Sequence, residues 1–280
     1  MTSRTGAPST VSLAQLRHDA LSLRHPLTRA LLVLTFTTGL VDATTYLGLG
    51  HVFAANMTGN IILLGFGIAG AGGLPVLAPL VSLAGFLTGA GLGGLLDAWL
   101  AHRSDHGFPI AVAIEAAVMA AATVIAAVVH VRGGHASGDL VIALLAVGMG
   151  LRNATVRALG VPDLTTTVLT MTLTGLAAAS PWGGGDGSGS IRRLSAVLAM
   201  LAGAIAGAML VKTSIALVLG VGAVLTVGTL GGYRVLSAPA DSSGPPGSGG
   251  DSGSTGESGS AGESGSDGAP ESDDAHGSGR

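Results

Sequence analysis

The side chains most able to do chemistry in this chain stand inside long apolar runs. Asp42, Arg152 and Asn153 each lie well within such a run. A charged side chain at the centre of a membrane costs about 2.5–3.5 kcal/mol on insertion scales, so it normally faces a partner or a water-filled cavity. We therefore expect Asp42 to serve an ion, proton or substrate site, or else to pair with Arg152 or cap a broken helix.

Hydroxyl and amide side chains gather in two further places. The first cluster is Asn56, Thr58 and Asn60, and the second is Thr170 and Thr172, which follow a threonine run at 165–167. Such groups can coordinate a small solute or a dehydrated ion, or form ordinary hydrogen bonds between membrane helices, worth about 0.6 kcal/mol each. With Asp42, Arg152 and Asn153 they form the candidate intramembrane polar site. Glu115 is another carboxylate, near enough to the end of its run to reach the membrane surface.

Several kinds of chemistry have no basis in this sequence. The chain has no cysteine, which excludes disulfides and thiolate ligands. His102 and His106 are spaced like metal ligands but have no evident third ligand. No nucleophile with an acid–base partner stands out, and no basic patch indicates nucleic acid. We therefore expect no catalytic residue, no metal, no cofactor and no nucleic-acid partner, and a protein that is not an enzyme.

The composition indicates the solvent that surrounds these residues. Hydrophobic residues make up 48% of the 280 and charged residues 10%, against about 25% charged in typical soluble domains. The basic residues are twelve Arg and one Lys, a bias typical of GC-rich bacterial genomes. A lipid bilayer, that of the bacterial cytoplasmic membrane, is therefore the expected partner of most of the chain.

Apolar segments occur at residues 30–49, 54–72, 76–98, 109–130, 139–159, 165–180, 194–211 and 213–231. A spanning helix needs about 20 apolar residues. The second segment is marginal and the sixth is short and rich in Thr, so these two either span or enter the membrane as re-entrant or broken helices. The expected fold is an all-α membrane protein, a polytopic bundle of 6–8 transmembrane segments.

The two ends of the chain are polar. Residues 1–28 carry Arg4, Arg17 and Arg24, and 11–23 could form an amphipathic interfacial helix. Residues 238–280 hold eight acidic residues among Gly, Ser and Pro and are expected to be a disordered acidic tail. The distribution of basic residues predicts that both termini are cytoplasmic.

The chain also resembles itself, which predicts two sequence-similar halves at 29–131 and 138–232. Gly39-Leu-Val-Asp42-Ala-Thr44 matches Gly150-Leu-Arg-Asn153-Ala-Thr155 at an offset of 111, and Thr58 matches Thr170 at 112. Gly85 and Gly89 match Gly203 and Gly207 at 118, and these GxxxG pairs are expected to pack helices of the two halves together. Four spans per half would make the repeats parallel, and three would make them inverted.

These residues carry a resemblance to a known family. The shared features are Gly39 with Asp42-Ala43, Phe53 with Met57-Thr58-Gly59-Asn60, Gly85 with Gly89, Gly148-Met-Gly150-Leu with Asn153-Ala154, and Gly203 with Gly207. In these features, over residues 30–232, the chain resembles the YoaK-type family of bacterial membrane proteins. The family pattern usually has Gln where this chain has Arg152, and the second Thr-Gly-Asn-like element reads Thr170-Met171-Thr172. The resemblance implies a multi-pass membrane protein and no particular substrate.

Three functions compete at this point. The leading hypothesis is a small-solute or ion transporter or channel-like protein with a polar site between the two repeats. The alternative is a non-transporting membrane scaffold or partner subunit that uses the acidic tail as its contact element. A membrane-embedded enzyme comes third. The sequence does not define an oligomeric state.

Overall fold

In the part of the chain that the structure describes, six helices are long enough and apolar enough to cross a membrane. The computed structural model describes residues 25–100, 107–159, 169–178, 180 and 189–237. Within these ranges the six are α2 (Pro26–Gly48), α4 (Leu77–Leu100), α5 (Gly107–Val128), α6 (Ala136–Ala158), α8 (Ser190–Leu210) and α9 (Ile215–Ser237). Their lengths are 21 to 24 residues. The same ranges contain no strand, so the predicted all-α bundle of several membrane helices is confirmed.

Two short helices occupy the apolar segments that were ambiguous in the sequence. α3 (Met57–Ile68) has 12 residues and a single turn, η1 (Ala71–Gly73), follows it, while α7 (Leu169–Ala178) has 10 residues. At 1.5 Å per residue they measure about 18 and 15 Å, roughly half of a 30 Å hydrocarbon layer. The predicted range of 6–8 spans therefore becomes six full-length helices and two half-length ones. The expected interfacial helix at 11–23 and the acidic tail lie outside the described residues.

Local hydrogen bonds cap the start of α2 and satisfy the hydroxyl groups within it. Pro26 stands in the first turn of α2, and the His25 ring nitrogen accepts from the Leu27 N–H. The threonine hydroxyls within α2 donate to backbone carbonyls three or four residues earlier, as in Thr35 to Leu31 and Thr44 to Leu40. α2 can therefore be buried although it is rich in threonine.

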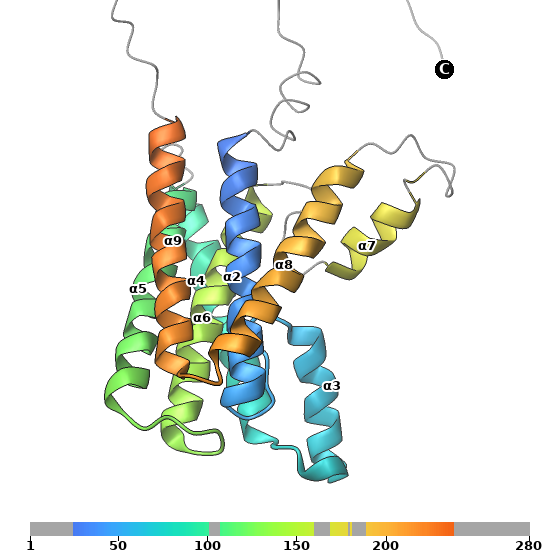
Figure 1. Cartoon of the computed structure of the whole chain (residues 1–280), viewed down its shortest axis with the longest axis vertical. Helices are drawn as coiled ribbons and strands as arrows, with labels where there is room; N and C mark the ends of the chain where they lie inside the picture. Colours follow the sequence, from blue (N-terminus) through green and yellow to red (C-terminus); the bar gives the residue numbers. More distant parts are fainter. Residues whose placement is uncertain (1–24, 101–106, 160–168, 179, 181–188, 238–280) are drawn as a thin grey trace, which may run out of the picture. The chain divides into compact units, whose positions relative to one another are not determined.

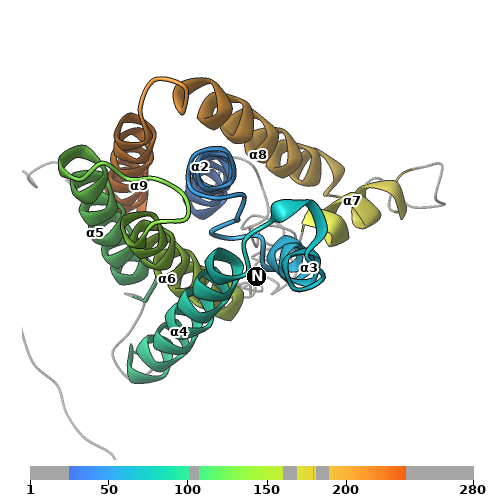
Figure 2. The same cartoon turned by 90° about the horizontal axis from the view of Figure 1, so that it is seen from below.

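α2 and α6 form the centre of the bundle. In the apolar 18-residue stretch of each of these two helices, 67% of the residues are buried, against 17–33% in the other four long helices. Figures 1 and 2 show α2 packed against α8 and α9, and α6 packed against α4 and α5. The start of α2 and the end of α9 lie at the same end of the bundle, since Pro26 and Tyr233 line one groove. The outer faces of α4, α5, α8 and α9 are left for lipid.

Glycines set the close approach of α8 to α2. A Cβ added to Gly203 would collide with the carbonyl oxygen of Phe36, and one added to Gly207 would lie 2.6 Å from the carbonyl oxygen of Leu40. A Cβ on Gly39 would collide with the carbonyl of Met200. The two helices run parallel, since positions increase along both together.

The approach of α4 to α6 has the same form. A Cβ on Gly89 would collide with the Val147 carbonyl, and one on Gly93 would lie 2.7 Å from the Leu151 carbonyl. Gly85, predicted to match Gly203, lies one turn earlier in α4 and faces Ala143. Gly89, rather than Gly85, meets a backbone carbonyl as closely as Gly203 does.

Candidate functional site

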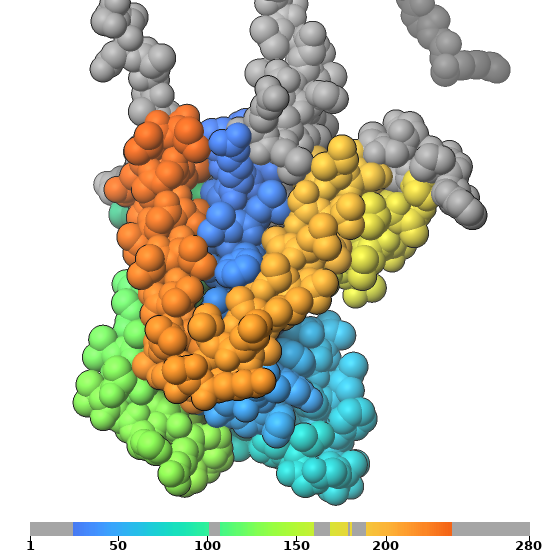
Figure 3. Space-filling view, in the orientation of Figure 1, coloured from blue at the N-terminus to red at the C-terminus, as the bar shows by residue number. Residues whose placement is uncertain are grey.

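A cavity of about 600 Å³ opens between α2, α3, α4, α7 and α8. It lies near the middle of the bundle, since Phe86 is the tenth of 24 residues in α4 and Met200 the eleventh of 21 in α8. In Figure 3 this face is hollowed between the yellow atoms of α7 and the blue atoms of α3. The described residues that line the cavity are Asp42, Ala55, Asn56, Met57, Thr58, Gly59, Ile62, Phe86, Leu169, Thr170 and Met200.

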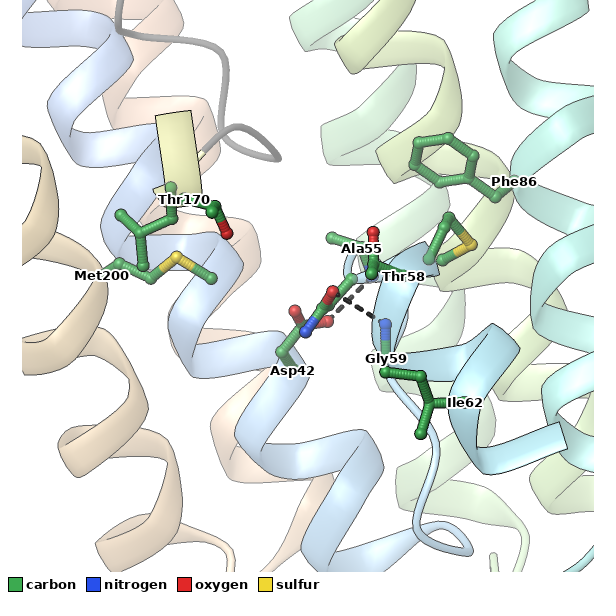
Figure 4. Close-up of a pocket in the computed structure, with 11 residues that line it drawn as sticks. Asp42, Ala55, Thr58, Gly59, Ile62, Phe86, Thr170 and Met200 are labelled. Carbon is green, nitrogen blue, oxygen red and sulfur yellow. Dashed lines mark hydrogen bonds between the residues drawn. The ribbon is translucent and has the colours of Figure 1, made fainter. Parts of the chain in front are cut away.

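Asp42 is the one ionisable side chain among these lining residues, and it is 5% exposed. Its Oδ1 accepts hydrogen bonds from the backbone N–H groups of Ala54, at 2.9 Å, and Ala55, at 2.8 Å. Its Oδ2 is buried and has no hydrogen-bond partner. Figure 4 shows the carboxylate between Ala55, Thr58 and Gly59 on one side and Met200 and Thr170 on the other. One oxygen therefore holds the backbone, and the other is a buried acceptor without a partner in a residue that lines the cavity.

The segment that Asp42 holds brings the chain back into the bundle after α2. Leu49, Val52, Ala54 and Ala55 are at most 1% exposed, and the segment ends at Asn56. Irregular backbone at membrane depth is tolerated where it is buried in protein or lines a water-filled cavity. The segment is buried, the Asp42 carboxylate accepts from two of its N–H groups, and its last residues line the cavity.

Asn56 and Asn60 have different tasks at the start of α3. Asn56 caps the helix, its Oδ1 accepting from the Gly59 N–H at 3.1 Å, and lines the cavity. Asn60 is fully buried, and its Oδ1 accepts from the Phe53 N–H while its amide donates to the Phe53 carbonyl. The Asn60 amide also donates to Ser82 of α4 at 3.0 Å. Asn60 thus anchors the returning segment on α3 and α4.

α7 reaches the cavity from the other side. Its Thr170 lines the cavity together with Met200 of α8, and farther along α7 the Gly175 carbonyl accepts from Arg193 at the start of α8. α7 is therefore antiparallel to α8. In the same way α3 is antiparallel to α4, since Asn60 bonds Ser82 and Gly67 approaches Val76. Figure 1 shows the two short helices running away from each other, α3 downward and α7 upward.

Arg152 lies elsewhere and has a different partner from the one expected. Its Nη1 donates to Glu115 Oε1 of α5 at 2.8 Å, and both side chains are 1% exposed. The guanidinium also donates to the hydroxyls of Thr37 and Thr38 in α2. Glu115, which was expected near the membrane surface, is instead fully enclosed, and Arg152 pairs with it rather than with Asp42.

The structure gathers half of the predicted site residues at the cavity. Asp42, Asn56, Thr58 and Thr170 line it. Asn60 and Thr172 are buried, and Asn153 donates to the Met149 carbonyl within its own helix. The rest of the lining was not predicted as part of the site, since most of it consists of apolar residues of the types that also face lipid. The lining residues that were missed are Ala55, Met57, Gly59, Ile62, Phe86, Leu169 and Met200.

The chemistry that this cavity supports is recognition. A mostly apolar wall with a few convergent polar groups is typical of small-molecule sites, whose volumes are about 300–1,000 Å³. Within the described residues, no group of three or more His, Asp or Glu side chains could hold a metal ion. Asp42, Thr58 and Thr170 supply the carboxylate and the hydroxyls among the residues that line the cavity.

Comparisons with known proteins agree with a membrane protein of this kind. The chain is 34% identical over 144 residues to the UPF0700 transmembrane protein YoaK of Bacillus subtilis (strain 168), an alignment that covers 51% of this chain and 63% of that protein. No solved structure matches the chain. The family model described as "Protein of unknown function (DUF1275)" matches residues 30–231. The match runs from near the start of α2 to the last part of α9 and so includes the described helices between them. The chain therefore belongs to this family of YoaK-type membrane proteins.

Proposed function

We propose that this protein moves a small solute or ion across the membrane, and that the solute binds in the cavity at Asp42. The observation that carries this proposal is the start of two half-length helices, α3 and α7, at one cavity that contains a buried carboxylate oxygen without a partner. A scaffold has no need of such a cavity, whereas transporters commonly bind solutes where discontinuous helices meet near the bilayer midplane.

The two halves of the chain support the proposal through their contacts. The backbone carbonyls of Phe36 and Leu40 in α2 approach Gly203 and Gly207 of α8. In the same way, the carbonyls of Val147 and Leu151 in α6 approach Gly89 and Gly93 of α4. These positions differ by 111 between α2 and α6, and by 114 between α4 and α8. We infer that α2–α5 and α6–α9 are repeats, each supplying one cavity-lining half-helix.

Helix directions favour an inverted relation between the repeats. Phe108 of α5 packs on Tyr233 of α9, and Met119 lies against Gly222, so these two helices are antiparallel. α2 packs antiparallel to α9, since Leu40 lies near Gly222 while Pro26 and Tyr233 line one groove. α6 packs antiparallel to α5, since Arg152 pairs with Glu115 while Gly148 lies near Val118. α2 and α6 therefore run in opposite directions. Inverted repeats around a central site suit alternating exposure of that site to the two membrane faces.

The proposed orientation places the start of α2 and the end of α9 in the cytoplasm of a bacterium. Arginines near that end of the bundle outnumber basic residues near the opposite end, where Arg132 and Lys212 lie. Basic residues near helix ends favour the cytoplasmic side. The arginines in question are Arg29, Arg157, Arg192, Arg193 and Arg234.

Site access tests the proposal directly, because the chain has no cysteine and a single introduced thiol is therefore unique. Thr58→Cys is placed in proteoliposomes and treated with a charged, membrane-impermeant thiol reagent from either face. A transport site is expected to react from both faces, because alternating conformations open the cavity in turn. Thr226→Cys, on the fully buried Thr226 side chain of α9 away from the cavity, is the matched unreactive control.

The outcomes separate the candidate functions. Reaction of Thr58→Cys from both faces supports transport. Reaction from neither face, while an exposed Thr213→Cys reacts fully, contradicts it and favours the scaffold. Deleting residues 238–280 adds a second distinction, since a transporter retains Thr58 access without the tail.

A further inference from the structure

The chemical class of the solute follows from the charges around the cavity. This inference rests on the proposed function and concerns the same site. Among the described residues that line the cavity, Asp42 carries the one ionisable group, and its Oδ2 has no partner. A carboxylate enclosed in a membrane bundle is costly unless a positive charge or hydrogen-bond donors accompany it.

The guanidinium of Arg152 does not bond to Asp42. It is paired with Glu115 at 2.8 Å, so the guanidinium is balanced by its own carboxylate. It also donates to Thr37 and Thr38, away from the cavity-lining residues. The arrangement of these three charged side chains therefore leaves one negative charge, and it lies on the cavity wall.

The start of α3 is not an equivalent site for an anion. Several donors around it already have acceptors, since the N–H groups of Ala54 and Ala55 donate to Asp42 and that of Gly59 donates to Asn56. An anion placed there would also meet the Asp42 carboxylate, and like charges at this range repel. The negative charge of Asp42 therefore already lies beside the start of α3.

The cavity is also larger and more apolar than an inorganic ion requires. Its volume of about 600 Å³ is many times the roughly 30 Å³ that a water molecule occupies in the liquid. Phe86 offers an aromatic face, and Met57, Leu169 and Met200 offer flexible apolar surface. Aromatic faces attract cations, and apolar side chains bury carbon atoms.

We propose that the cavity binds a small organic cation, an amine that carries its ammonium group to the Asp42 carboxylate. The carbon part of the solute packs against the apolar side chains of Phe86, Leu169 and Met200. Thr58 and Thr170, one from each short helix, are placed to accept remaining ammonium hydrogens through their hydroxyl oxygens.

The test compares two thiol reagents of opposite charge on Thr58→Cys in the full chain. The cationic reagent is 2-(trimethylammonium)ethyl methanethiosulfonate and the anionic one is 2-sulfonatoethyl methanethiosulfonate. Each rate is divided by the rate of the same reagent with the exposed Thr213→Cys. The normalised rate is expected to favour the cation by about tenfold, a factor that about 1.4 kcal/mol supplies. Asp42→Asn, which keeps an acceptor for Ala54 and Ala55, is expected to abolish the preference.

Protection by small solutes completes the experiment. n-Butylammonium chloride is expected to slow the labelling of Thr58→Cys, and sodium butyrate of the same carbon number is expected to have no effect. Equal normalised rates for both reagents, or protection by butyrate alone, would overturn the cation proposal while leaving a solute cavity in place. Failure of both reagents to react would instead contradict the proposed function, so the two failures are distinguishable.

Discussion

Arg152 of α6 and Glu115 of α5 form an ion pair of 2.8 Å in which each side chain is 1% exposed. The same guanidinium donates to Thr37 and Thr38 of α2, so one side chain connects three helices. The helices concerned include both central ones, and α2 also carries Asp42. The pair therefore holds α2, the helix that carries Asp42, against α5 and α6.

Breaking this pair is expected to destabilise the protein more than removing it. Glu115→Leu leaves a buried guanidinium without its carboxylate, and Arg152→Met leaves a buried carboxylate without its guanidinium. Loss of one partner of a buried pair costs about 3–5 kcal/mol, whereas replacing both by apolar residues is often nearly neutral. The midpoint of thermal unfolding in detergent should fall in each single variant and recover in the double variant. Additive losses in the double variant would show that the pair is not a coupled unit.

Gly89 is expected to be intolerant of a methyl group that Gly91, in the same helix, accepts. A Cβ at Gly89 would collide with the Val147 carbonyl, whereas none of the surrounding atoms lies within 4 Å of one at Gly91. Gly89→Ala should therefore separate α4 from α6 and cost about 1–3 kcal/mol, as overpacking does. Gly91→Ala should be neutral or stabilising. Equal thermal midpoints for the two variants would contradict the close packing of α4 on α6.

Asn60 should matter more than its neighbour Ser82. Asn60→Ala leaves the buried Phe53 N–H without its acceptor, while Ser82→Ala leaves the Phe53 carbonyl still bonded to Asn60. An unsatisfied buried polar group costs about 1–3 kcal/mol. Asn60→Ala should lower the thermal midpoint clearly and Ser82→Ala only slightly. The reverse order would mean that the returning segment is anchored by α4 alone.

The half-length helices can be checked by the side from which introduced cysteines react. His51 precedes α3 and Ala71 follows it, and both should face the same side as Thr213. Ser180 and Leu236 should face the opposite side, next to the end of α7 and the end of α9. Single-cysteine variants at these positions, labelled with an impermeant reagent in oriented vesicles, test this. Reaction of His51→Cys and Ala71→Cys from opposite sides would mean that α3 crosses the membrane completely.

The sequence predicted the long helices well because each is an apolar run close to the length that a bilayer requires. The segments at 54–72 and 165–180 were ambiguous for a physical reason. Their composition is apolar enough for a membrane helix. Composition does not show that the chain re-enters the bundle after α2 and that α3, from Asn56 onward, runs back toward the side on which α2 ends. That turn depends on the hydrogen bonds of Asp42 and Asn60 with the returning backbone, which are tertiary contacts.

The site was predictable only where polar residues interrupt apolar runs. Asp42, Thr58 and Thr170 stood out for that reason, whereas Phe86 and Met200 are the same residue types that face lipid elsewhere. The expected pairing of Arg152 with Asp42 came from the position of Arg152 beside Asn153, the sequence match of Asp42. Neighbouring helical residues point about 100° apart, so Arg152 faces α5 and meets Glu115 instead.

α3 and α7 begin at one cavity, and crosslinking of Thr58→Cys with Thr170→Cys tests this arrangement most directly. Both residues line the same space of about 600 Å³. In the double variant, which has no other thiol, a bifunctional methanethiosulfonate about 10 Å long should join the two cysteines within one chain, and n-butylammonium should slow the reaction. If both cysteines react singly with the reagent and yet no intramolecular link is found by mass spectrometry, the two short helices do not meet and the account is wrong.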